Sequence, residues 1–211
     1  MAERIIGYFA RRIGNPYLVS AILSVIPATE LKGSILYAAT CGGRVWLAAL
    51  VGYLTSLLFA LFHTFVLPAV VRSLRRHPRA ERLWMLLTAR ISESAESILC
   101  RANGSEDRRE RLFLGVYAFV AIPLPLTGIW AGAILATMLD LDRGRTFFAL
   151  AAGNFTAGGI VLAVAFLAGT HASLVLDAFC ILVALFIVGA FLKSLIGKKG
   201  DKDRKKKASS L

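Results

Sequence analysis

The chain has 211 residues, of which 57% are hydrophobic and only 18% are charged, with a formal net charge of +12. Soluble domains average about 45–50% apolar and about 25% charged residues, so this composition excludes a water-soluble globular enzyme and a disordered chain. The basic residues cluster beside apolar stretches long enough to span a bilayer, which indicates an all-α polytopic integral membrane protein and argues against nucleic-acid binding.

The first apolar stretch, residues 17–43, is interrupted by Pro27-Ala28-Thr29-Glu30. Because proline removes a backbone donor and clashes with the preceding turn, we expect the helix to break there. The next stretch, residues 45–71, is uninterrupted and long enough to cross a hydrocarbon core of about 30 Å. Residues 17–71 are therefore predicted to form a broken helix followed by a whole helix.

Residues 72–111 are predicted to form a cytoplasmic loop, because they contain ten of the Lys and Arg residues. Within this loop, apolar side chains recur at helical spacing between Leu83 and Ile98, with charged side chains on the opposite face. The pattern predicts an amphipathic helix over about residues 79–101. We expect it to lie on the membrane interface or to pack against another subunit.

The second broken stretch, residues 112–139, contains Pro123 and Pro125. A whole apolar stretch follows it at residues 146–169, so the order of the first half is repeated over residues 112–169. We expect these two prolines to open the helix as Pro27 does.

A last spanning helix is predicted at residues 174–196, which gives about three spanning helices beside the two broken stretches. The transmembrane domain is then a single unit over residues 1–197. Residues 198–211 are predicted to be a disordered basic tail beside anionic lipid on the cytoplasmic side.

The two breaks share a Pro-x-Thr pattern, at Pro27/Thr29 and at Pro125/Thr127. We interpret it as a pseudo-inverted repeat of two re-entrant helical hairpins. Each threonine is expected to cap the second half-helix by accepting a bond from a backbone N–H. The alternative is a pair of proline-kinked spanning helices whose similarity is accidental.

Charge favours re-entry of the second stretch from the cytoplasm. If residues 112–139 crossed the membrane, the basic loop and the eight Lys and Arg residues at 193–207 would lie on opposite sides. For the N-terminus the arguments conflict, because pseudo-symmetry places the start of the first hairpin outside. We favour a cytoplasmic N-terminus because of Arg4, Arg11 and Arg12.

Glu30 and Lys32 are the strongest candidate site residues, because a charge near the membrane centre costs about 2.5–3.5 kcal/mol on insertion scales. Two residues apart on a helix, they are not expected to face each other, so each needs another partner or water. The alternative is that Glu30 only caps the half-helix and Lys32 extends to the interface.

Further candidates for substrate or ion binding lie at the breaks and in the following helix. Packing is the alternative for the glycine, and His63 is expected to be a buried, hydrogen-bonded histidine rather than a proton relay. No catalytic, nucleotide-binding or metal-ligand motif occurs in the sequence, so we expect no enzyme activity, no cofactor and no metal. The further candidates are Thr29, Thr127, Gly128, Trp130 and Asn154.

Two motifs resemble a known family. Glu30-Leu31-Lys32-Gly33-Ser34-Ile35 is similar to the Glu-Leu-Arg-Gly-x-Ile signature of the small multidrug export proteins of bacterial and archaeal inner membranes. The run from Pro123 to Ala136 is similar to their Pro-Leu-Pro-Gly-Thr-Gly-Ala-Trp-Thr-Gly-Ala signature. The resemblance covers about residues 17–170 and implies a likeness to the DedA superfamily, with its two re-entrant hairpins. Lys32 stands where these proteins have arginine, which keeps the charge without the planar fork.

The resemblance implies a multi-pass inner-membrane secondary transporter of a small or amphipathic substrate, with a proton as one candidate coupling ion. Glu30 would bind that proton or a cationic substrate at a midplane site. Two alternatives stay open: DedA-like translocation of a phosphate-bearing lipid carrier, and a non-transport membrane scaffold. The expected partners are membrane lipids and the substrate, without nucleic acid, and a homo-oligomer is compatible with the sequence.

Overall fold

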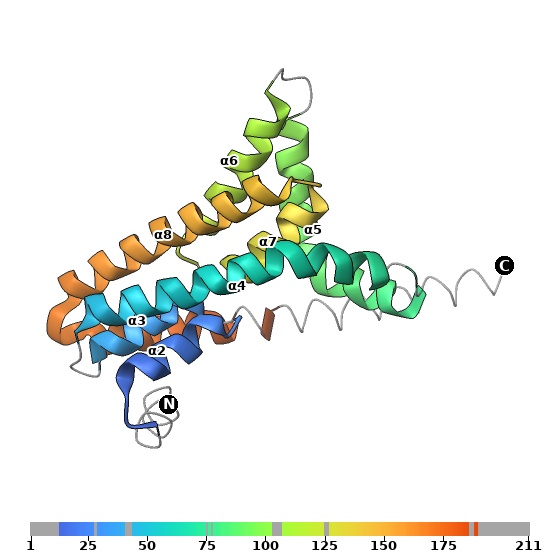
Figure 1. Ribbon diagram of the computed structural model, residues 1–211. Helices are drawn as coiled ribbons and strands as arrows, with labels where there is room; N and C mark the ends of the chain where they lie inside the picture. Colours follow the sequence, from blue (N-terminus) through green and yellow to red (C-terminus); the bar gives the residue numbers. More distant parts are fainter. Residues whose placement is uncertain are drawn as a thin grey trace.

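The computed structural model of the chain describes residues 13–189, except 28, 41–43, 75, 77, 103–106, 125–126 and 186–187. Every regular element in this part of the chain is helical (Figure 1). The all-α prediction is therefore confirmed for the described residues.

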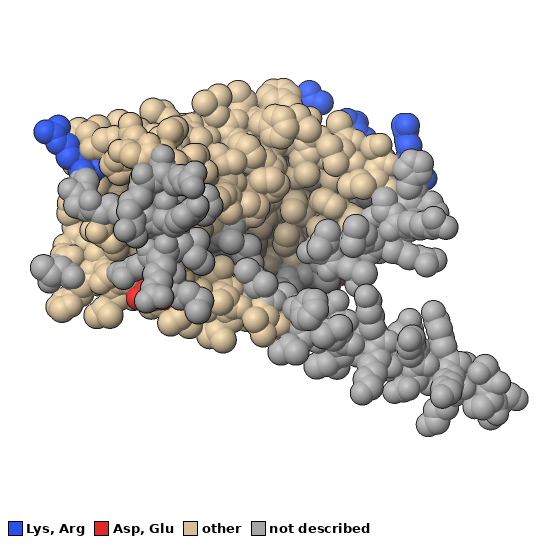
Figure 2. Space-filling model, turned by 90° about the horizontal axis from the view of Figure 1, so that it is seen from below, with Lys and Arg blue, Asp and Glu red and all other residues tan. Residues whose placement is uncertain are grey.

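Two described helices are long and apolar enough to cross a membrane: α4 (Val45–Leu74) and α8 (Arg143–Ala168). Large apolar side chains cover their outer faces, for example Leu58, which is 70% exposed, and Phe155. Figure 2 shows Lys and Arg at the edges of one face of the molecule and an uncharged middle where the surface is drawn in tan. Such a surface fits lipid better than water.

The first broken stretch forms two helices, α2 (Pro16–Val25) and α3 (Glu30–Thr40), with the predicted break between them. Asn15 caps α2, because its Oδ1 accepts the backbone N–H groups of Tyr17 (2.9 Å) and Leu18 (3.3 Å). The two helices pack against each other and beside the first half of α4 (Figure 1).

The second broken stretch also forms two helices, α6 (Arg108–Ala121) and α7 (Ile129–Met138). The start of α6 and the end of α7 lie at the same end of the molecule, because Arg108, Leu112, Leu139 and Asp140 line one cavity. The stretch therefore turns back on itself at its break.

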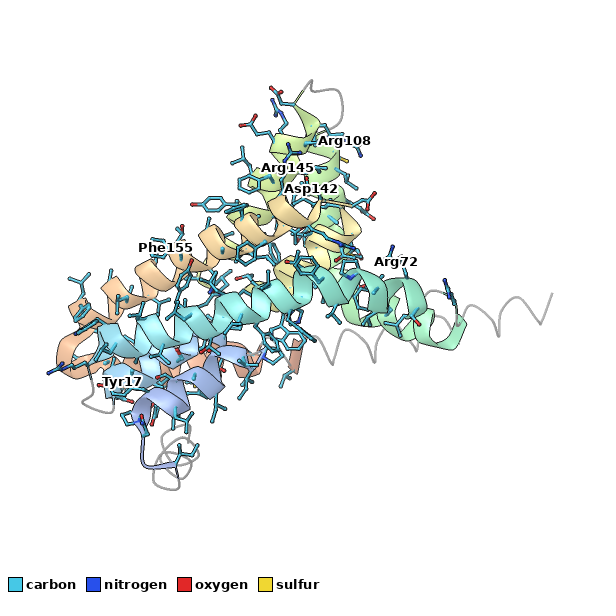
Figure 3. All side chains as sticks on the ribbon, viewed as in Figure 1. Tyr17, Arg72, Arg108, Asp142, Arg145 and Phe155 are labelled. Carbon is cyan, nitrogen blue, oxygen red and sulfur yellow. The ribbon has the colours of Figure 1, made fainter. Side chains whose placement is uncertain are left out.

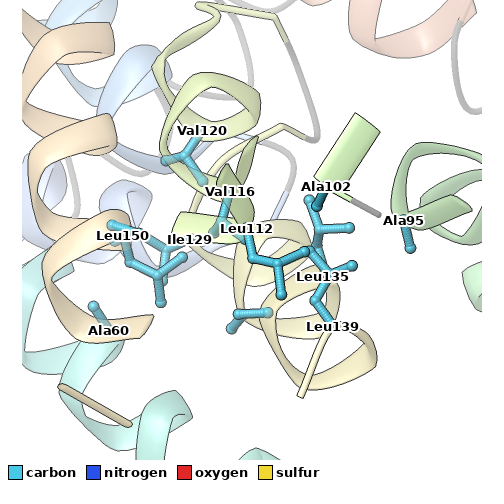
Figure 4. Packing of buried hydrophobic residues seen from close by; sticks show 13 residues of the cluster. Ala60, Ala95, Ala102, Leu112, Val116, Val120, Ile129, Leu135, Leu139 and Leu150 are labelled. Carbon is cyan, nitrogen blue, oxygen red and sulfur yellow. The ribbon is translucent and has the colours of Figure 1, made fainter. Parts of the chain in front are cut away.

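The amphipathic prediction corresponds to α5 (Pro78–Ala102). Its described apolar side chains pack against α6 and α7, since Ala95 and Ala102 belong to the buried cluster that Figure 4 shows with Val116 and Leu135. The prediction placed this face on the membrane interface or on another subunit, whereas its described side chains from Ile91 to Ala102 pack against the chain's own helices. The reason is that α6 and α7 present apolar side chains beside it.

Close packing at the centre depends on α8 approaching α6. A Cβ on Gly153 would lie 2.9 Å from the carbonyl oxygen of Tyr117 and 2.8 Å from Cβ of Val120. Only glycine at this position allows the backbones to come so near.

The last predicted span is described in part, as a helix over residues Ala172–Leu185 after the 3-10 turn η1 (Gly169–His171). Several other sequence predictions lie on residues outside the described ones. They are the end of the last span, the tail at 198–211, the basic N-terminus with Arg4, Arg11 and Arg12, and the break residue Pro125.

Candidate functional site

The two broken stretches meet at their breaks, beside the middle of α4. Lys32 Nζ of α3 donates hydrogen bonds to the carbonyl oxygen of Leu124 (2.7 Å) and to Thr127 Oγ1 (3.2 Å). From the other side, the Trp130 indole N–H donates to the carbonyl oxygen of Val25 (2.9 Å). These bonds join residues 92 to 105 positions apart in the sequence, so they hold the two breaks together.

Glu30 and Lys32 are both buried, at 4% and 1% exposure, and Lys32 Nζ lies 3.8 Å from Glu30 Oε2. The expectation that they do not contact each other is wrong. Glu30 has a left-handed backbone with φ of 48°, so the side-chain spacing of a regular helix does not apply to it. The alternative that Lys32 extends to the interface is also wrong, because its ammonium group is enclosed.

The Glu30 carboxylate lies against Gly128, the N-cap of α7, where a Cβ would overlap it. The positive end of the α7 dipole favours a negative charge there, and the backbone N–H of Trp130 adds to this field. Lys32 Nζ and the Trp130 backbone N–H face the carboxylate, but neither oxygen meets full hydrogen-bond geometry with a donor among the described residues. A buried carboxylate whose oxygens are not fully hydrogen-bonded is a position where a proton or a cation can bind.

The predicted caps at Thr29 and Thr127 are wrong. Thr29 Oγ1 donates backward to the carbonyl oxygen of Leu23 (2.6 Å), and Thr127 Oγ1 donates to those of Ile122 and Leu124 (2.8 Å each). At the breaks the carbonyl oxygens of Leu23 and Ile122 accept the backbone N–H groups of Ile26 (3.3 Å) and Leu124 (2.8 Å), and they accept these hydroxyls as well. The negative charge of Glu30 takes the place of a cap on α7.

Asn154 lies in the middle of α8 and is 1% exposed. The residue before it, Gly153, packs on α6. One turn after Asn154, Gly158 lies so near α3 that an added Cβ would meet Leu31. Asn154 Oδ1 and Nδ2 have no hydrogen-bond partner among the described residues. The structure therefore places a buried amide with unused hydrogen-bonding capacity between the two broken stretches.

The structure adds His63 to the site. Its Nδ1 lies 2.8 Å from the carbonyl oxygen of Phe59, which confirms the buried, bonded histidine. The imidazole also packs edge-to-face against Trp130, with ring centroids 4.4 Å apart and ring planes at 69°. The signal in the sequence was the polar pair His63-Thr64 inside an apolar span, but only the packing of α7 on α4 shows what it contacts.

A cavity of about 640 Å³ extends from the arginine-rich end of the molecule to His63. It lies between the C-terminal end of α4 and the starts of α6 and α8. Figure 3 shows Arg72, Asp142 and Arg145 gathered at this end, far from Tyr17 at the start of α2.

Replacing Trp130 by Phe should lower the free energy of unfolding by about 1 kcal/mol, because the carbonyl oxygen of Val25 loses its donor while the ring still packs on His63. Unfolding in mixed micelles of a mild detergent and dodecyl sulfate measures this change. Trp46→Phe is the control, since Trp46 is 53% exposed. Equal losses in both variants would contradict the role of the indole bond.

Comparison with protein families gives one match. A model described as "Putative small multi-drug export protein" matches residues 30–160, which include Glu30, Lys32, Trp130 and Asn154. No curated protein and no solved structure in the comparison matches the chain.

Proposed function

Because the chain belongs to the small multi-drug export protein family, we propose that it is a secondary membrane transporter that couples export of a small or amphipathic substrate to protonation of Glu30. The observation behind this proposal is the buried Glu30 carboxylate, which lies where the two breaks meet, 3.8 Å from Lys32 Nζ, with neither oxygen in full hydrogen-bond geometry among the described residues. Structural ion pairs in proteins usually satisfy their carboxylates, so this one is more suited to exchanging a proton.

The proposal includes two re-entrant hairpins that enter the membrane from opposite faces. The second stretch begins and ends at the arginine-rich end, beside Arg145 of α8. The first stretch ends at Thr40, shortly before α4 starts at Val45. The arginine-rich end lies at the other end of α4, where Arg72 lines the cavity. This arrangement supports a pseudo-inverted repeat with its site at the midplane.

Protonation of Glu30 would remove its attraction to Lys32 and to the N-terminus of α7. The hydrogen bonds that join the breaks would then be the main remaining contacts between the hairpin tips. In our proposal the tips separate in one protonation state and close in the other, which biases a two-state equilibrium and exposes the site alternately.

The arginine-rich end is proposed to be cytoplasmic in the inner membrane, in line with the positive-inside rule. Arg72, Arg109, Arg143 and Arg145 come from three helices and line the same cavity at this end. A cytoplasmic cavity of this kind would be the side from which an exporter takes its substrate.

The alternatives have less support. A DedA-like carrier would use Lys32 to hold a phosphate, but Lys32 Nζ already contacts Leu124, Thr127 and Glu30. A scaffold would offer the apolar face of α5 to a partner, but described side chains of that face pack on α6 and α7.

The test is substrate-coupled proton movement in proteoliposomes that contain a pH-sensitive dye. Gradients of ethidium and of naphthalenesulfonate serve as cationic and anionic probes. We expect the wild-type chain to move protons with one of them and Glu30→Gln to abolish this coupling, because glutamine cannot bind a proton at that position. Glu110→Gln, at an exposed glutamate of α6, should retain full coupling. Unchanged coupling in Glu30→Gln would reject the proposal.

A further inference from the structure

The charges around the 640 Å³ cavity are unbalanced. Four arginines and two aspartates line it. Asp142 is already committed, because its Oδ1 lies 3.5 Å from Arg145 Nη1 and its Oδ2 accepts the Arg145 backbone N–H at 3.0 Å. Arg143 stands over the Phe65 ring, 5.4 Å from its centroid.

Arg72 and Arg109 form no ion pair within the described part of the chain. The remaining acidic residue among those lining the cavity is Asp140. The cavity mouth therefore holds two guanidinium groups, from α4 and α6, with one carboxylate to offset them. Guanidinium groups bind carboxylate, phosphate and sulfonate oxygens through their planar set of donors.

The deeper part of the cavity is mixed in character, because the buried His63, Thr64 and Thr146 line it beside apolar side chains. Leu112 and Ala133 line it as buried residues, together with Pro68. The hydroxyls of Thr64 and Thr137 donate to carbonyl oxygens one turn earlier, at 2.8 Å each, so they are not free donors for a ligand. A small inorganic anion would leave this region empty, whereas a ligand with an apolar body would fill it.

The inner end of the cavity adjoins the candidate site. His63 lines the cavity and packs edge-to-face against Trp130. Trp130 follows Gly128 by two residues, and Gly128 contacts the Glu30 carboxylate. A ligand in the cavity would be separated from Glu30 by the ring pair of His63 and Trp130.

We propose that this cavity binds organic anions in which one acidic group is attached to an apolar body, and that it is the first binding site of the exported substrate. The second clause rests on the proposed function, whereas the binding itself does not. The volume falls in the range of about 300–1,000 Å³ that is usual for sites of drug-sized ligands.

The test uses the full chain in nanodiscs of neutral phosphatidylcholine and three probes with the same apolar body. These are naphthalenesulfonate, naphthalenemethanol and naphthylmethylammonium, and their binding is measured by calorimetry. We expect the sulfonate to bind about tenfold tighter than the ammonium compound, which corresponds to about 1.4 kcal/mol. Equal binding of the two charged probes would overturn the proposal.

Substitutions locate the site. The double variant Arg72→Gln, Arg109→Gln should weaken sulfonate binding about tenfold, since it removes two charge-assisted contacts in a partly solvated mouth. Asp140→Asn should strengthen it, because it removes the opposing charge. Arg44→Gln is the matched control, since Arg44 is exposed and precedes the opposite end of α4. An equal loss in this control would overturn the proposal.

A parallel titration with dihexanoyl phosphatidic acid distinguishes the two sources of such an anion. Tighter binding of the lipid assigns the site to membrane lipid, and tighter binding of the sulfonate assigns it to a soluble substrate. Both results support an anion site. If neither compound binds, the proposal is overturned.

The two proposals can fail separately. Retained coupling in Glu30→Gln, with sulfonate binding that depends on Arg72 and Arg109, would reject proton coupling and keep the anion site. Lost coupling in Glu30→Gln, with sulfonate binding that does not depend on Arg72 or Arg109, would keep proton coupling and reject the anion site.

Discussion

Replacing Lys32 by Met is expected to destabilise the folded chain by about 3–5 kcal/mol, because the Glu30 carboxylate would stay buried without its counter-charge. Lys32 is enclosed, so solvent cannot screen the remaining charge. The substitution also removes the hydrogen bonds to Leu124 and Thr127, which join the two breaks. Methionine keeps the length and the apolar stem of lysine, so little of the loss comes from a cavity.

A double-mutant cycle separates these contributions. Glu30→Gln alone should cost less than Lys32→Met, because Lys32 keeps its two other partners. Combining both substitutions should recover much of the loss, since a neutral pair needs no compensating charge. Equilibrium unfolding in mixed micelles measures all three variants, with Arg44→Met as the control at an exposed cation. A Lys32→Met loss no larger than that of the control would show that the ion pair does not hold the breaks together.

Replacing Gly128 by Ala is expected to destabilise the chain by about 1–3 kcal/mol, because a Cβ would occupy the position of the Glu30 carboxylate. The carboxylate would have to leave the N-terminus of α7 and its contact with Lys32. We therefore also expect a loss of proton coupling in the proteoliposome assay, by displacement of Glu30 rather than by its removal.

Gly159→Ala is the matched control, because a Cβ on Gly159 of α8 would have no atom within 4 Å. Alanine there should be neutral or stabilising by about 0.5–1 kcal/mol, as in an exposed helix. Adding Glu30→Ala to Gly128→Ala should reduce the loss below the sum of the single variants, since the smaller side chain makes room. Additive losses would mean that Gly128 and Glu30 do not share this space.

Several features of the chain could be predicted from local sequence. Hydropathy predicted α4 and α8, and the amphipathic period predicted α5 to within one residue at each end. Pro27 and Pro123 predicted both breaks, because the steric and hydrogen-bonding effects of proline act on its own turn. Their position inside an apolar stretch identified Glu30 and Lys32 as candidate site residues, and both are buried.

Predictions that assumed a regular backbone or a free partner failed at the site. Helical spacing separated Glu30 from Lys32, but the left-handed backbone at Glu30 brings them together. Cap preferences assigned Thr29 and Thr127 to the helices that follow them, but carbonyl groups at the ends of the preceding helices accept their hydroxyls. In both cases a neighbouring group outside the local pattern determined the outcome.

The residue sequence by itself determined a helical membrane chain with two interrupted stretches and a charged pair at the first interruption. Only the tertiary structure decided that the interruptions meet, that Glu30 lies on Gly128, that His63 packs against Trp130, and that arginines from three helices line one cavity. The physical reason is range: hydropathy and proline geometry act over a few residues. Contacts between positions about a hundred residues apart depend on how whole helices pack.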